Sequence, residues 1–229
     1  MIRVVKVSKR FGDKIVLDNV SFEVTKNENL VILGPTGTGK TVLLKIMIGL
    51  LKPDQGEVYF DSKCVQSLSD PELFELRKNI GFIFQSTALF DSMTVFENIA
   101  LGLEEHTKLR AAEIKEKVDQ ILKIIDMSGT EDLYPHSLSG GMKRLVSIGR
   151  SLALDPEYFL YDEPTSGLDP NSAQNVCNLI IKLRDEHKKC AIIVTHDLDS
   201  ARQISDNILM LRKGKIYKTE KDIRRLYGD

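Results

Sequence analysis

The sequence predicts an α/β domain with a mixed sheet core, an antiparallel β subdomain and an inserted helical lobe. Short β-rich runs alternate with helical patterns along the 229 residues, and no repeat or low-complexity stretch interrupts them. Between 85 and 155 the pattern is mainly helical. We therefore expect one domain over 1–229, in which 1–84 and 156–229 form the α/β core and 85–155 forms the helical lobe.

The opening of the chain is predicted to be antiparallel. Three short alternating segments, Ile2–Val7, Ile15–Leu17 and Val20–Val24, are separated by turn residues. The next run, Leu30–Leu33, is continuously apolar, which is typical of a strand covered on both faces. A glycine-rich turn and a helical stretch through Ile48 follow it.

The later elements are predicted in the same way. Tyr158–Tyr161 and Ala191–Val194 are further candidates for buried strands. Ser172–Glu186 is predicted to be a crossover helix, and Ile208–Leu211 with Ile216–Thr219 a closing strand pair. Within the lobe, one apolar helical face is formed by Ile114, Val118, Ile121, Leu122 and Ile125.

Composition excludes several classes of function. The chain has 32 Lys and Arg against 33 Asp and Glu, and a formal net charge of -1 gives no excess with which to hold nucleic acid. Three cysteines without a C-x-x-C pair argue against a disulfide framework and indicate a reducing compartment. No membrane span or signal peptide is found, so we expect a cytoplasmic protein that could still dock on a membrane protein. The charged run Lys221–Arg225 is interpreted as a solvated helix face.

The glycine-rich turn carries a complete phosphate-binding pattern. It follows a buried strand and opens a helix, so its backbone N–H groups are expected to form an anion nest at a helix N-terminus. Lys40 would reach the β- and γ-phosphates of a nucleotide, and the Thr41 hydroxyl would bind magnesium. The alternative is a glycine-rich turn without a ligand. The residues of the loop are Gly34, Pro35, Thr36, Gly37, Thr38, Gly39, Lys40 and Thr41.

Two carboxylates and a histidine are expected at the same edge of the sheet. Asp162 and Glu163 directly follow a buried strand and precede Pro164, which stops the strand. Asp162 would hold magnesium through water, and Glu163 would polarise the attacking water. His196 ends the run that begins at Ala191 and could contact the γ-phosphate. The alternatives are surface charge for the carboxylates and a structural role for the histidine.

A second anion-binding helix end is predicted in the lobe. Ser139 is a credible N-cap, and Gly140 and Gly141 expose N–H groups at the positive end of the helix dipole. The alternative is a simple capped helix. Two copies placed head to tail would pair the glycine-rich loop of one with the Ser139 end of the other, which predicts a homodimer.

Taken in order, these motifs resemble those of the nucleotide-binding subunit of ABC transporters, from about Ile2 to Thr219. The resemblance implies a P-loop NTPase of ABC type, with ATP and magnesium as cofactors. Phe11 is similar to the aromatic residue that stacks on adenine, the alternative being a buried core Phe. In the family's terms, Gly34–Thr41 resembles Walker A, Gln85 the Q-loop glutamine, Leu138–Met142 the signature, Tyr158–Asp162 Walker B, Glu163 the catalytic glutamate, Ser166–Asp169 the D-loop and His196 the switch histidine.

The resemblance also implies site residues that spacing alone does not. Gln85 joins Thr41 and Asp162 as a magnesium residue, and Asp169 joins the nucleotide-binding set. Met142 departs from the family, which commonly has Gln there; phosphate contact is expected from Ser139 and backbone N–H groups, so ATP binding should persist. The Met-containing signature resembles the Mla/Mce subgroup of bacterial phospholipid and lipid transport ATPases.

The function implied is ATP hydrolysis that powers a separate membrane permease, with phospholipid or a related lipid as cargo. We expect the chain to dimerise on ATP, to sit peripherally on the cytoplasmic face of the inner membrane, and to work with a lipid-binding component but no nucleic acid. Ser86–Val95, with Ala88, Leu89, Phe90 and Met93, would line the permease groove; alternatively these side chains pack under the lobe.

Three other functions stay open. One is a soluble ABC-type ATPase that acts in protein or cofactor assembly. Another is an importer ATPase for a polar solute. The third is a module that holds nucleotide without turnover, which Glu163 and His196 argue against.

Overall fold

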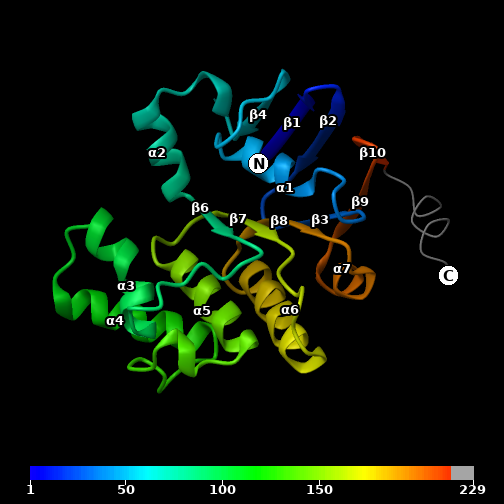
Figure 1. Cartoon of the computed structure of the whole chain (residues 1–229). Coiled ribbons are helices and arrows are strands. Elements are labelled where there is room, and N and C mark those ends of the chain that lie inside the picture. Colours follow the sequence, from blue (N-terminus) through cyan, green and yellow to red (C-terminus); the bar gives the residue numbers. More distant parts are fainter. Residues whose placement is uncertain (218–229) are drawn as a thin grey trace.

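Two β-sheets organise residues 1–217, the part of the chain that the computed structural model describes (Figure 1). The larger sheet has six strands in the order β10-β9-β3-β8-β7-β6. All neighbouring strands are parallel except the terminal pair β9 and β10. The strands are β3 (Asn29–Leu33), β6 (Ile80–Ile83), β7 (Tyr158–Asp162), β8 (Cys190–Thr195), β9 (Asn207–Arg212) and β10 (Lys215–Tyr217).

The smaller sheet has four antiparallel strands in the order β2-β1-β4-β5, formed by β1 (Ile2–Phe11), β2 (Lys14–Val24), β4 (Gln55–Phe60) and β5 (Lys63–Cys64). The two strands expected at 15–17 and 20–24 are in fact one strand, β2. Its pairing with β1 continues across register shifts, and Asn19 has a positive φ of 54° there. An asparagine tolerates this left-handed backbone, so the interruption is a kink and not a turn.

Side chains alternate across the six-stranded sheet and divide the core in two. Val31, Phe159 and Ile193 belong to the cluster shared with the helical lobe. Ile32 and Leu160 belong to the cluster shared with the antiparallel sheet and α1 (Lys40–Met47). Figure 1 shows these two parts of the molecule on opposite sides of the sheet. The continuous apolar runs are explained, because both faces of each strand are buried.

The lobe contains α3 (Val95–His106), α4 (Ala111–Ile124) and α5 (Gly140–Leu152). The predicted apolar face from Ile114 to Ile125 is buried along its whole length. The crossover helix is α6 (Pro170–Asp185), and α7 (Leu198–Ile204) precedes the closing strand pair. The remaining helical elements are α2 (Asp70–Lys78), η1 (Val65–Ser67) and η2 (Pro135–Ser137).

The segment 55–83 contains elements that the sequence patterns do not predict, including β6. This strand has only four residues, and Gly81 interrupts its apolar run. The glycine is needed because a Cβ there would lie 2.6 Å from Cε1 of Phe159 on the neighbouring strand. The description of the chain ends at Tyr217 in β10, so Thr219 and Lys221–Arg225 lie outside the described residues.

No helix within residues 1–217 is both long enough and apolar enough to cross a membrane.

Candidate functional site

The glycine-rich loop connects β3 to α1, as its pattern predicts. Gly39 has a φ of 102°, and a Cβ on it would lie 2.8 Å from Cγ1 of Val16 on β2. A glycine is therefore required both for the left-handed backbone and for the close approach of β2. The turn folds the Lys40 side chain back over the loop, where its Nζ donates to the carbonyl oxygens of Gly34 (2.5 Å) and Pro35 (3.2 Å). The lysine is thus held at the centre of the nest.

Parallel pairing brings the other site residues to this loop. Leu33 of β3 lies opposite Thr195 of β8, and Asp162 of β7 lies opposite Val194. The residues that follow these strands therefore leave the same edge of the sheet. Glu163 turns the chain at once, with a φ of 52° and its N–H donating to the Val194 carbonyl. A non-glycine residue in this conformation is strained, which is common where a side chain has a functional position.

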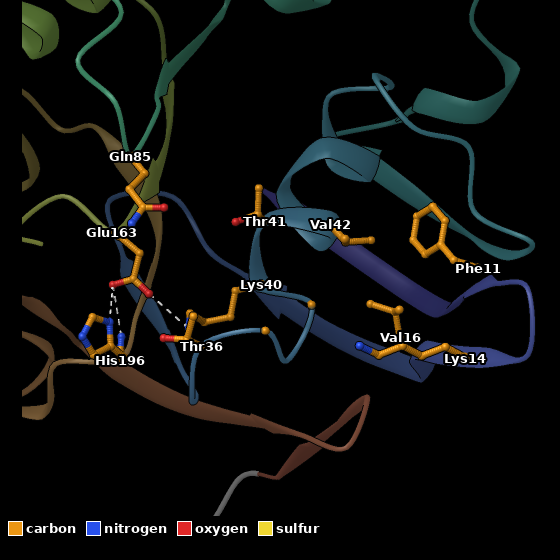
Figure 2. Close-up of a pocket in the computed structure, with 12 residues that line it drawn as sticks. Phe11, Lys14, Val16, Thr36, Lys40, Thr41, Val42, Gln85, Glu163 and His196 are labelled. Atoms are coloured by element: carbon orange, nitrogen blue, oxygen red, sulfur yellow. Dashed lines mark hydrogen bonds and ion pairs between the residues drawn. The ribbon is translucent and has the colours of Figure 1, made fainter.

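The Glu163 carboxylate is the most heavily contacted group at this edge (Figure 2). One oxygen pairs with Nζ of Lys40 at 3.1 Å. The other lies 2.8 Å from Nδ1 of His196 and 3.2 Å from the hydroxyl of Thr195. Its side chain is 9% exposed, whereas that of His196 is 49% exposed. The carboxylate is therefore fixed in position, and the imidazole beside it remains open to a ligand.

Thr41 and Asp162 form a second polar pair below the loop. The Thr41 hydroxyl donates to the Asp162 carboxylate at 3.1 Å. Burial raises the pKa of Asp162, the Thr41 hydrogen bond opposes that shift, and the negative charge of Glu163 adds to it. A hydroxyl and a carboxylate are the hard oxygen donors that Mg²⁺ prefers, and Mg²⁺ commonly keeps several waters. This donor pair therefore fits a magnesium ion.

A cavity of about 430 Å³ opens above these groups. Phe11 lies at its far end and is 48% exposed, so it is not the buried core residue of the alternative interpretation. Figure 2 shows Phe11 separated from Glu163 and His196 by the loop and the start of α1. The cavity is lined by Phe11, Lys14, Val16, Thr36, Gly37, Gly39, Lys40, Thr41, Val42, Gln85, Glu163 and His196.

Three of these lining residues belong to none of the motifs identified in the sequence. Lys14 and Val16 lie on β2, which the fold brings over the loop, and Val42 is the next residue after Thr41. The contact between Val16 and the loop joins segments that are far apart along the chain, so no local pattern reveals it. Val42 directly follows the glycine-rich loop, and this position is the sequence signal from which it could have been predicted to line the cavity.

The second predicted helix end does not reach this cavity. Ser139 caps α5, its hydroxyl accepting from the Met142 N–H at 3.2 Å. Gly141 packs on the start of α6, because a Cβ there would lie 2.4 Å from Oγ of Ser172. Asp169 caps α6 by accepting from the Ser172 N–H at 3.0 Å, and hydrogen bonds from the side chain and the backbone of Ser172 lower the pKa of Asp169. Within one chain these residues make the contacts of two capped, closely packed helices.

Comparisons with known proteins agree with this geometry. A family profile described as ABC transporter matches residues 17–166. The phospholipid transport ATP-binding protein MlaF of Haemophilus influenzae is 38% identical over 94% of this chain and 82% of its own length. A probable ribonucleotide transport ATP-binding protein, mkl of Mycobacterium leprae, is 39% identical over 92% of the chain, which spans 60% of that protein.

Among solved structures, the ATP-binding cassette MJ0796 superposes with a TM-score of 0.85. It is 33% identical, covering 95% of this chain and 98% of its own, and its structure is a dimeric post-hydrolysis state bound to ADP and Pi. The fold and the site define a P-loop ATPase. The chain belongs to the ABC transporter family. The predicted fold class, ATPase activity and resemblance to Mla-type ATP-binding subunits are confirmed.

Proposed function

We propose that this chain is the ATP-hydrolysing subunit of an ABC transporter that powers a separate membrane permease, with phospholipid or a related lipid as cargo. One observation carries the ATPase part of the proposal: the buried Glu163 carboxylate is held between Lys40 of the loop and His196, the residue after β8. The similarity to MlaF supports the cargo. In this role the chain sits peripherally on the cytoplasmic face of the inner membrane.

Nucleotide binding uses the two ends of the cavity. The N–H groups of residues 36–41 at the start of α1 receive the phosphates, and Lys40 pairs with the β- and γ-phosphates. The ammonium of Lys40 then exchanges its contact with Glu163 for the phosphate oxygens. Phe11 stacks on adenine at the exposed end of the cavity, beside Val16. The nucleotide therefore bridges the antiparallel sheet and the loop.

Thr41, Asp162 and Gln85 are the residues that would hold magnesium, which offsets phosphate charge when bound. Thr41 would offer its hydroxyl oxygen, and Asp162, which accepts from that hydroxyl, would hold the ion through water. Gln85 faces the same cavity from the segment after β6 and offers a neutral amide oxygen. A neutral oxygen adds a ligand there without adding repulsion toward the phosphates.

Hydrolysis uses Glu163 as the base that polarises the attacking water. As the water oxygen attacks the γ-phosphorus, the carboxylate accepts its proton and the bond to the bridging oxygen breaks, releasing ADP and phosphate. Thr195 and the backbone N–H of His196 hold the carboxylate in place. The exposed imidazole of His196 contacts the γ-phosphate and orients the water.

Two copies complete each site. The Ser139–Gly141 end of α5 has free N–H groups at the positive end of a helix dipole, yet it lies outside the cavity of its own chain. In a head-to-tail homodimer formed on ATP binding, this end contacts the γ-phosphate held by the partner chain. Asp169 and the loop before α6 lie at the same dimer contact.

The permease contacts the segment 86–95. Phe90 is 49% exposed, as expected for a residue that lines the permease groove. Leu89 and Met93 are half-buried, as expected if they pack under the lobe. The loop is rigidly held: the buried Asn98 side chain bonds the backbone of Phe90, Met93 and Thr94. A fixed loop that displays one aromatic ring suits the docking of a partner helix.

The test is to purify the native complex from membranes, identify its permease and lipid-binding component, and measure lipid transfer after reconstitution. We expect bound phospholipid, ATP-dependent transfer, and a Phe90→Asp variant that keeps the basal ATPase of the isolated subunit but loses transfer. A complex that moves only a polar solute would overturn the lipid cargo and favour the importer alternative. The similarity to mkl, a probable ribonucleotide transport ATP-binding protein, supports a polar cargo. A chain found only with soluble partners would favour an assembly ATPase.

A further inference from the structure

One buried cation lies outside the cavity but touches a residue that lines it. Arg144 is on α5, in the second turn after Ser139, and is 3% exposed. Its Nη1 donates to the carbonyl oxygen of Phe84 at 2.6 Å, and its Nη2 donates to that of Gln85 at 2.7 Å. The planar guanidinium therefore clamps two consecutive peptide carbonyls where the chain leaves β6.

Stability alone does not explain this arginine. Burial lowers the pKa of the Arg144 guanidinium, and only the negative charge of Asp162 opposes that shift. Its Nε is buried without a hydrogen-bond partner among the described residues. A buried cation that is held by carbonyl dipoles and has an unsatisfied donor costs free energy of folding compared with an apolar side chain of similar size. A role beyond packing is therefore worth testing.

The position of the clamp suggests that role. Fixing the carbonyls of Phe84 and Gln85 fixes the direction in which the Gln85 side chain leaves the backbone, and that side chain enters the nucleotide cavity. The other end of the link is α5, whose first turn is the Ser139–Gly141 anion-binding end. α5 thus connects Gln85, which faces the nucleotide cavity of its own chain, with the Ser139–Gly141 end, which would contact the nucleotide held by the partner chain.

We propose that Arg144 is a positioning residue that sets the place of Gln85 and couples it to the Ser139–Gly141 end of α5. This inference rests on the function proposed above for Gln85. α5 shifts when its N-terminus closes on a phosphate. The guanidinium of Arg144, which bonds the carbonyls of Phe84 and Gln85, then moves the backbone of Gln85 together with the helix. Arg144 therefore acts on the rate of hydrolysis without touching the nucleotide.

The first experiment compares Arg144→Met and Arg144→Lys with the wild type. Met keeps the length and the apolar packing but removes the fork, and we expect kcat to fall about ten- to a hundredfold, because displacing a positioned group by about 1 Å can cost up to about a hundredfold. Lys keeps the charge but has no planar fork, so it should retain an intermediate kcat. The Kd for ATP, measured on the monomer, should stay unchanged, and half-maximal activity should need more magnesium.

Arg77 is a matched control. Its guanidinium also bonds two consecutive carbonyls, those of Ile48 (2.9 Å) and Gly49 (3.2 Å), at the end of α1 away from the cavity. Arg77→Met removes the same kind of clamp, so it should lower the melting temperature but leave kcat and the magnesium requirement of the folded protein at wild-type values. A loss of kcat in this variant equal to that of Arg144→Met would overturn the proposal.

A double-mutant cycle with Gln85→Ala decides whether Arg144 acts through Gln85. If it does, Arg144→Met will lower kcat in the wild-type background and have little further effect beside Gln85→Ala. Additive losses, or a wild-type kcat for Arg144→Met, would overturn the inference and leave the proposed function standing. A wild-type kcat for Gln85→Ala would refute the role of Gln85 itself, and the inference with it.

Discussion

Two helix N-termini within residues 1–217 are suited to anions, but only the one at α1 has charged side chains and a cavity brought together in a single chain. At α1, the loop residues, Lys40 and Glu163 already contact one another around a cavity. At α5, Ser139 caps the helix, and none of the residues that line the cavity at α1 comes from the first turn of α5. A helix dipole alone therefore provides attraction for phosphate, whereas a reaction also needs a base held at a fixed distance.

The largest expected effect is on the site at α1. Glu163→Gln keeps the shape of the side chain but cannot accept the proton of water, so we expect kcat to fall by about 10²–10⁴-fold. Nucleotide binding should remain, because the loop and Lys40 are unchanged. Steady-state ATPase assays beside nucleotide titrations measure both quantities. A wild-type rate would show that Glu163 is not the base.

The next effect separates the two helix ends. Ser139→Arg places bulk and positive charge at the start of α5, so we expect loss of the ATP-induced dimer and most of the ATPase activity while the monomer still binds nucleotide. Sizing in the Glu163→Gln background with ATP and magnesium detects the dimer. If Ser139→Arg still dimerises, the two-copy site is wrong.

Lys40→Ala should instead weaken nucleotide binding to the monomer, with ATP affinity lowered about ten- to hundredfold.

A smaller effect concerns the glycines of the second end. Gly141→Ala introduces a Cβ that would overlap Oγ and Cβ of Ser172, whereas a Cβ at Gly140 would make an ordinary 3.6 Å contact with Leu168. We expect Gly141→Ala to lower the free energy of unfolding by about 1–3 kcal/mol. Gly140→Ala, the matched control, should be close to wild type. Chemical denaturation measures both, and equal values would show that the α5–α6 packing is not tight.

The smallest effect tests the cost in folding free energy of burying the Asp162 carboxylate at the α1 site. Burial raises the pKa of Asp162, so the folded protein binds a proton there more tightly than the unfolded chain does, and stability is lost as the pH rises through the folded pKa. Asp162→Asn removes this cost and keeps an acceptor for Thr41. We expect its melting temperature without nucleotide to be about 2 °C higher at neutral pH. The difference from wild type should shrink as the pH falls, and a constant difference would contradict this explanation.

Buried strands with continuous apolar runs could be predicted from the sequence, whereas contacts between distant segments could not. The buried strands β3, β7 and β8 were predictable because both faces of each strand are covered, which leaves continuous apolar runs such as Leu30–Leu33. The residues to which we assign the reaction, Glu163 and His196, lie directly after β7 and β8. By contrast, β6 was missed because Gly81 packs against Phe159, and this contact between β6 and β7 joins segments far apart along the chain.

The same limit applies to the site. Lys14 and Val16 entered the cavity without a motif, because only the fold places β2 over the loop. The expected pair of strands before Val24 became the single strand β2, since Asn19 adopts a left-handed backbone inside a continuing ladder. Arg144 gives no signal in the sequence either, because its partners are backbone carbonyls, which every residue has.

The left-handed backbone of Glu163 places two demands on one position. A glycine would adopt this conformation without strain. It would, however, remove the carboxylate that pairs with the buried Lys40 and leave that cation without a counter-charge. Relief of backbone strain and loss of the ion pair therefore act in opposite directions on stability at position 163. The carboxylate to which we assign the base of the proposed reaction is thus also the group that balances the charge of the loop lysine in the absence of nucleotide.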